Sequence, residues 1–131
     1  MGTSGAASHC SILLVEDEPL LAMDMELVLL EAGFQLAGMA MNIRDAMGLL
    51  QQRVPDLTIL DLNLGGEMVF PLLDILCERD IPFVVLSGHS RDLVPARHRH
   101  RPYLQKPCDP AALLAEVRGT LNQHGGGELP A

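Results

Sequence analysis

Four short, mostly apolar segments of this 131-residue chain each end in a polar or charged residue, and this pattern limits the possible folds most strongly. The segments are 11–15, 57–60, 83–86 and 103–105, and the residues that follow them are Glu16 and Asp17, Asp61, Ser87, and Lys106. Segments of this kind, bounded by turn residues, predict buried parallel strands. Because open parallel sheets place their sites beyond the carboxyl ends of the strands, we expect these polar side chains to meet at one edge of one sheet.

Helical segments alternate with the strands, and neither a repeat nor a linker interrupts them. The alternation predicts one α/β domain with a parallel sheet over residues 10–123, with flexible segments at 1–9 and 124–131. The other expected elements are helices over 19–32, from Asn42 onward, from a loop at 63–66 to about Arg79, and from Pro110 onward, and a strand over 34–40.

The expected first helix carries more apolar residues than one buried face needs. Met23, Leu27 and Leu30 have near-helical spacing and form the predicted core stripe. The remaining apolar residues admit two interpretations, a broad core face or an apolar docking surface. They are Leu20, Leu21, Met25 and Leu29.

The segment 88–101 lacks the periodicity of an amphipathic helix, although a doubly wound fold places a helix there. Leu93, Val94 and Ala96 are its only apolar residues, and Pro95 interrupts them. We therefore predict that the fourth helix is short or replaced by a loop, and that this segment is mobile. The basic cluster 97–101 is interpreted as a solvated loop, with a phosphate or metal patch as the alternative.

The composition of the chain argues against several kinds of partner and against a membrane-spanning or secreted protein. The net charge of −8 disfavours nucleic acid and anionic membranes. No apolar run approaches the roughly 18–20 residues that cross a bilayer, and the start of the chain does not resemble a secretory signal. Cys10, Cys77 and Cys108 match no zinc motif, and an odd number of cysteines fits ordinary thiols in a reducing cytoplasm.

Three carboxylates at one sheet edge repel one another and favour a bound cation. A like-charged pair about 4 Å apart costs roughly 4 kcal/mol at an effective dielectric constant of 20. Protonation or a cation relieves this repulsion. Hard oxygen ligands select Mg²⁺ or Mn²⁺ over zinc, and Mg²⁺ commonly shares a phosphate oxygen. The Lys106 ammonium and the Ser87 hydroxyl suit the other oxygens of a phosphoryl group.

With these residues in place, the chain resembles the receiver domain of two-component response regulators from about Ser11 to Asn122. The stretches that carry the resemblance are 14–18 (Leu-Val-Glu-Asp-Glu), 60–64 (Leu-Asp-Leu-Asn-Leu), 86–88 (Leu-Ser-Gly) and 106–107 (Lys-Pro). The resemblance implies a flavodoxin-like, doubly wound fold whose five parallel strands have the order 2-1-3-4-5. It implies a histidine kinase or a histidine phosphotransfer protein as partner, and we expect a monomer or weak dimer.

The resemblance also assigns the phosphorylation chemistry. Asp61 is the phosphoacceptor. Glu16 and Asp17 hold Mg²⁺ together with Asp61 and the backbone carbonyl of Asn63. Lys106 contacts the phosphoryl group. The first acidic position is Glu16, where Asp is commoner in the family.

A second set of roles concerns the switch and the lifetime of the phosphoryl group. The resemblance implies that Ser87 contacts the phosphoryl group and forms the switch together with Tyr103, and that the Lys106–Pro107 bond is cis. Asn63 and His89 stand at positions that influence phosphoryl lifetime, although His89 also fits a solvent-facing loop residue. Kinase docking is assigned to Leu20, Leu21, Asp24, Pro107 and Cys108.

Within the family, the chain resembles stand-alone receivers with a Pro-Phe-x-Phe-Ala-Thr-Gly-Tyr-type motif, but it departs from that motif at Val85, Leu86, Ser87 and His89.

Several alternatives to a phosphorylated stand-alone receiver remain open from the sequence. The chain could be a degenerate receiver that binds partners without phosphorylation, a phosphate sink, or a piece of a longer protein. An Asp-nucleophile phosphatase of the haloacid dehalogenase class is disfavoured, because such enzymes need a second Asp where this chain has Asn63.

Overall fold

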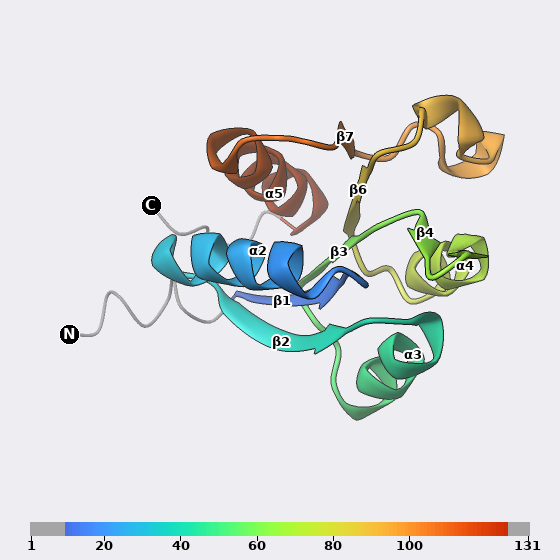
Figure 1. Cartoon of the computed structure of the whole chain (residues 1–131). Coiled ribbons are helices and arrows are strands. Elements are labelled where there is room, and N and C mark those ends of the chain that lie inside the picture. The colour runs from blue at the N-terminus through green and yellow to red at the C-terminus, as the bar shows by residue number, and fades with distance from the viewer. Residues whose placement is uncertain (1–9, 126–131) are drawn as a thin grey trace.

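The four predicted strand segments and the segment after the first helix form one five-stranded parallel sheet in the computed structural model, which describes residues 10–125 (Figure 1). The strands are β1 (Ser11–Val15), β2 (Gln35–Ala40), β3 (Leu57–Leu60), β6 (Phe83–Ser87) and β7 (Tyr103–Gln105). Their spatial order is β2-β1-β3-β6-β7, which confirms the predicted order 2-1-3-4-5. The parallel register pairs Val15 with Leu60, so that β1 and β3 end side by side.

Helices cover both faces of the sheet, and this explains why the inner strands β1, β3 and β6 are buried along their whole length and mostly apolar rather than alternating. Leu13 and Val15 pack on the side of α3 (Ile43–Gln52) and α4 (Phe70–Glu78). Ile12 and Leu14 pack on the side of α2 (Pro19–Glu31) and α5 (Pro110–Gly125). Two apolar layers therefore hold the sheet rigid, and the polar residues gather at its carboxyl edge.

Helix α2 has the predicted bounds. Pro19 lies in its first turn, and Gly33 adopts a φ of 98° just past its end. The Gly33 and Phe34 amides donate to the carbonyls of Leu30 and Leu29, which closes the helix in the manner expected for glycine at this position.

The predicted core stripe of α2 is wrong. Met23, Leu27 and Leu30 are 59%, 57% and 47% exposed, whereas the buried residues of this helix are Ala22, Met25 and Leu29. The buried and exposed sets have nearly the same spacing along the helix. Because α2 is apolar on more than one side, periodicity alone could not select the face that packs on the sheet.

The expected loop 63–66 is instead a small antiparallel hairpin. Strands β4 (Asn63–Leu64) and β5 (Glu67–Met68) pair across Gly65 and Gly66, whose φ values are 59° and 93°. Two glycines with positive φ fit a tight hairpin turn. Helix α4 then begins at Phe70, with Pro71 in its first turn.

Between β6 and β7, where a doubly wound fold has its fourth helix, the chain forms a loop instead, as predicted. This missing helix is not the one labelled α4, which lies before β6. The loop contains two short 3-10 turns, η1 (Arg91–Leu93) and η2 (Ala96–His98). The interpretation of 97–101 as a solvated patch is wrong for His98, which is only 3% exposed. Together with the buried Val94, His98 anchors the loop to the domain, an arrangement that depends on α4 residues remote in the sequence.

Two smaller expectations are also confirmed. The Asn42 side chain accepts from the Asp45 amide at the start of α3, and the Lys106–Pro107 bond is cis. Among the described residues, no helix is long and apolar enough to cross a membrane. The expected flexible ends, 1–9 and 124–131, lie outside the described residues except for the last turn of α5.

Candidate functional site

Three carboxylates meet at the carboxyl edge of the sheet, as predicted. Glu16 and Asp17 follow β1, Asp61 follows β3, and one ligand oxygen from each lies within 4.8 Å of the others. Glu16 is 2% exposed, Asp61 is 9% exposed, and Asp17 is half-buried. The adjacency of β1 and β3 brings residues 45 positions apart in the chain into one cluster.

Lys106 reaches this cluster from the edge strand β7, which it directly follows. Its Nζ lies 2.8 Å from Asp61 Oδ2 and 2.9 Å from Glu16 Oε1. Burial acts to lower the pKa of Lys106, but the hydrogen bonds to Asp61 and Glu16 outweigh it and raise the pKa above its ordinary value. Lys106 therefore stays a cation beside the proposed phosphoacceptor.

For Glu16, burial outweighs the hydrogen bonds in setting the pKa. Burial raises its pKa above the ordinary range, and the hydrogen bonds from Lys106 and from the Glu18 amide offset this only in part. A buried carboxylate of this kind gains from any further cation placed against it.

The hairpin β4–β5 positions two further site residues. The Gly65 amide donates to Asp17 Oδ2 at 2.8 Å, and the Gly66 amide donates to Asn63 Oδ1 at 2.8 Å. Asn63 lies two residues past Asp61, and its amide is 3.4 Å from Asp61 Oδ1. Treating these glycines as part of a loop missed their role, although two adjacent glycines after Asp61 were the available signal.

Ser87, His89 and Tyr103 form a chain of contacts on the same side of the site. Ser87 is fully buried, and its Oγ accepts from the His89 amide at 3.1 Å. The Tyr103 hydroxyl donates to the His89 carbonyl. The main chain of His89 thus links the two predicted switch residues, whereas its side chain is exposed, and sequence reasoning missed this link.

The three carboxylates fit a hard divalent cation. When all are ionised, three carboxylates against the Lys106 ammonium leave a net charge of −2. The ligand set is all oxygen and contains no thiol or imidazole, which matches Mg²⁺ or Mn²⁺ rather than zinc. Glu16, Asp17 and Asp61 are the residues that would hold the ion, and the Asn63 carbonyl stays a predicted fourth ligand.

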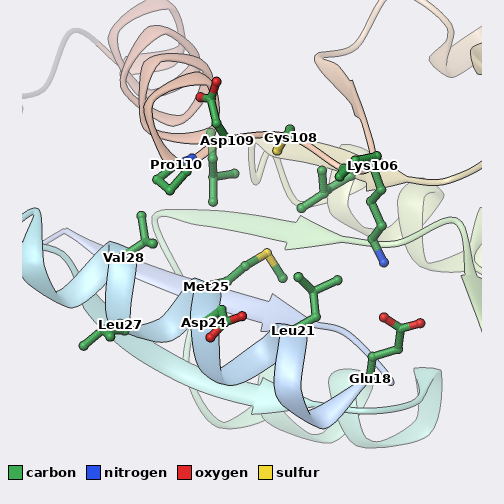
Figure 2. Close-up of a pocket in the computed structure, with 13 residues that line it drawn as sticks. Glu18, Leu21, Asp24, Met25, Leu27, Val28, Lys106, Cys108, Asp109 and Pro110 are labelled. Atoms are coloured by element: carbon green, nitrogen blue, oxygen red, sulfur yellow. The ribbon is translucent and has the colours of Figure 1, made fainter.

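Most of the predicted docking residues line one pocket beside the site. The pocket has a volume of about 640 Å³ and lies between α2 and the segment from Lys106 to Leu113. Leu21, Asp24, Pro107 and Cys108 all line it, whereas Leu20 does not and is 78% exposed nearby on α2. Figure 2 shows Leu21, Met25 and Val28 pointing from α2 toward the opposite segment, with Lys106 at the end of the pocket.

The fold and the acidic edge define a class of protein. The family model of the response regulator receiver domain matches residues 12–118, and the chain belongs to this family. Members of the family generally bind Mg²⁺ at an acidic cluster, and the group Glu16, Asp17 and Asp61 is such a cluster.

Three individual relatives are similar to this chain over most of its length. The chain is 38% identical to SdrG from Sphingomonas melonis Fr1, whose solution structure matches with a TM-score of 0.75 over 88% of this chain and 97% of that chain. It is 35% identical over 116 residues to the transcriptional regulatory protein PdtaR of Mycobacterium tuberculosis, covering 86% of this chain and 57% of PdtaR. It is 28% identical to the phyllosphere-induced regulator PhyR of Methylorubrum extorquens, and the match covers 84% of this chain and 43% of PhyR. The chain spans about half the length of these curated relatives.

Proposed function

We propose that this receiver takes a phosphoryl group from a phosphohistidine of a kinase or phosphotransfer protein onto Asp61. The observation that carries the proposal is the contact between Asp61 and Lys106 at 2.8 Å within the acidic cluster. Asp61 is the carboxylate at the end of the central strand, and Lys106 supplies a fixed positive charge beside it. Glu16 and Asp17 are then available as metal ligands rather than as nucleophiles.

The proposed reaction is a phosphoryl transfer between two side chains. A carboxylate oxygen of Asp61 forms a bond to phosphorus while the bond between phosphorus and the donor imidazole breaks. Lys106 and the Ser87 hydroxyl stabilise the phosphoryl oxygens. When bound, Mg²⁺ neutralises negative charge that develops on the phosphoryl group. Hydrolysis of the acyl phosphate later returns Asp61 to its carboxylate form, and Asn63 and His89 are proposed to set its lifetime.

Incubation with acetyl phosphate and Mg²⁺, followed by intact mass measurement, tests this proposal. A receiver gains the mass of one phosphoryl group. A degenerate receiver gains none, and an Asp-nucleophile phosphatase hydrolyses acetyl phosphate continuously without retaining the group. The intact Asp61, Lys106 and carboxylate pair favour the first outcome.

We further propose that the pocket beside the site receives the phosphodonor. It extends from Lys106 along α2, so a partner seated in it would lie next to Asp61. Leu21, Pro107 and Cys108 provide its apolar wall, and Asp24 provides a charged edge. Leu20 continues the surface outside the pocket.

Leu21→Glu should slow phosphotransfer from a kinase that phosphorylates the parent chain by about tenfold or more, because an unpaired charge in an apolar contact costs roughly 1–3 kcal/mol. Labelling by acetyl phosphate should persist, since Leu21 lines the pocket and is not one of the residues of the carboxylate cluster. Val54→Glu is the matched control, because Val54 is 65% exposed and precedes β3 at the opposite end of the sheet. Loss of both kinds of labelling, or of neither, would count against docking here.

The output is proposed to be a protein–protein contact by a monomer or weak dimer in the cytoplasm. The solved SdrG chain, matched over 97% of its length, is one receiver structure of similar extent. The curated relatives named as transcriptional or phyllosphere-induced regulators extend well beyond the matched region. The kinds of regulation in their names are therefore only candidates for the output of this chain. A phosphate sink and a receiver within a longer protein remain the alternatives.

Amide hydrogens of 89–93 should exchange rapidly in the unmodified protein and more slowly after phosphorylation. This part of the loop is exposed, and its link to the site is the His89 amide bonded to Ser87 Oγ. Phosphorylation is expected to draw the Ser87 hydroxyl toward the phosphoryl group and the adjoining backbone with it. Exchange across 96–101, which is anchored by His98, serves as the internal comparison. Strong protection of 89–93 before phosphorylation would contradict the prediction.

A further inference from the structure

A second cluster of reactive side chains lies away from the carboxylate site, where the loop between β6 and β7 meets α4. Cys77 Sγ lies 3.6 Å from His98 Nδ1, and the opposite ring nitrogen, Nε2, lies 2.7 Å from Asp74 Oδ1. The Arg101 guanidinium donates from Nη2 to Cys77 Sγ at 3.1 Å. None of these residues has a role in the proposed phosphoryl transfer.

The carboxylate of Asp74 fixes which nitrogen of His98 carries hydrogen. Hydrogen bonds from Arg97 and His98 lower the pKa of Asp74 to about 2, so that it is ionised at neutral pH and can only accept. His98 Nε2 must therefore donate to Asp74. In the neutral ring, Nδ1 is then the acceptor, and it faces the Cys77 sulfur.

Packing holds the His98 ring in this orientation. His98 is 3% exposed, and its ring packs edge-on against Phe83 with centroids 6.0 Å apart. The Arg101 guanidinium lies over the same phenyl ring at 5.5 Å. Arg101 Nε is buried without a hydrogen-bond partner, which leaves an unused donor on the guanidinium that contacts the sulfur.

From this geometry we propose that Cys77 is a peroxide-reactive thiol, a redox modification site on α4 where this helix meets the loop between β6 and β7. His98 accepts the thiol proton, Asp74 stabilises the resulting imidazolium, and Arg101 stabilises the thiolate. The sulfur then attacks one oxygen of hydrogen peroxide and the O–O bond breaks. The sulfur is oxidised by two electrons to sulfenic acid, and the leaving hydroxide takes the proton from His98 to become water.

The other two cysteines are internal controls. None of the three described cysteines is in a disulfide, and all are half-buried. Burial and the charge of Asp56 raise the pKa of Cys10, and burial and the charge of Asp109 raise the pKa of Cys108. The contact with a His–Asp pair is seen at Cys77, so comparing cysteines of similar exposure in different surroundings separates reactivity from accessibility.

The test is dimedone trapping of sulfenic acid after a brief exposure of the whole protein to hydrogen peroxide, with peptide mapping by mass spectrometry. Cys77 should be labelled at least about tenfold faster than Cys10 or Cys108 in the folded protein. In urea the three rates should become similar, because the cluster is lost. Equal labelling of Cys10 or Cys108 in the folded protein would overturn the proposal.

Variants distinguish proton transfer from simple exposure. Asp74→Asn should slow both the dimedone labelling of Cys77 and its alkylation by iodoacetamide severalfold relative to the parent. Glu78→Gln, which removes a charge from the exposed face next along α4, should leave both rates unchanged. Arg101→Gln tests the other side of the sulfur if Asp74→Asn does not fold. Unchanged reactivity of Cys77 in whichever of these two variants folds would overturn the assignment.

Discussion

Asp61→Asn should leave the protein with no phosphoryl group after incubation with acetyl phosphate and Mg²⁺, while the parent gains one. The amide cannot act as the anionic nucleophile, and the two neighbouring acids are not equivalent substitutes. Glu16 is bonded to Lys106 and to the Glu18 amide, and Asp17 is bonded to the Gly65 amide. Intact mass measurement before and after treatment with hydroxylamine, which cleaves acyl phosphates, reports the result.

Asp92→Asn is the matched control for this variant. Asp92 is exposed on η1, away from the carboxylate cluster, so the same chemical change there should leave labelling intact. Circular dichroism should show that Asp61→Asn folds, because Lys106 keeps its bond to Glu16. Full labelling of Asp61→Asn would show that another residue is the phosphoacceptor.

Removal of divalent cations should abolish labelling by acetyl phosphate, which is the second large effect. The cluster of Glu16, Asp17 and Asp61 carries more negative charge than Lys106 can neutralise, and the incoming phosphoryl group adds more. EDTA should therefore suppress labelling, and Mg²⁺ or Mn²⁺ should restore it. Calcium is expected to restore it less well, because it prefers more ligands at longer distances.

Mg²⁺ should also stabilise the fold in the absence of any phosphodonor. At a tenfold excess over its Kd, a ligand that binds only the folded state adds about 1.4 kcal/mol to the free energy of unfolding. A domain of this size should then melt a few degrees higher. Asp17→Asn should lose this shift, and Asp92→Asn should keep it. A melting temperature unchanged by millimolar Mg²⁺, with labelling unaffected by EDTA, would contradict the metal assignment.

The loop between β6 and β7 shows where sequence reasoning reached its limit. The absence of apolar periodicity in 88–101 correctly predicted that a loop replaces the fourth helix. The burial of His98 could not be predicted, because its partners Asp74 and Cys77 come from α4, more than 20 positions earlier in the chain. A basic segment is predicted to be solvated unless the sequence indicates a carboxylate that pairs with it, and here that carboxylate is Asp74 on α4.

Helix α2 shows a different limit. Pro19 and Gly33 fixed its ends from local chemistry, since proline and glycine act on the backbone of their own turn. The face that it buries was predicted incorrectly, because apolar residues surround most of the helix. Ala22, Met25 and Leu29 are the side chains that meet the sheet and α5, and only their positions relative to those elements distinguish them from Met23, Leu27 and Leu30.

The amino-acid sequence by itself determined that strands alternate with helices and which residues form the carboxylate cluster, whereas the strand order followed from the resemblance to receiver domains. It placed these residues together because parallel strands end at one edge, so that a polar residue directly after each strand has a defined destination. The tertiary structure alone decided the 2.8 Å contact of Lys106 with Asp61, the hairpin that binds Asp17, and the grouping of Cys77, His98 and Asp74. These contacts join residues far apart in the chain, and their distances and burial depend on how the elements pack.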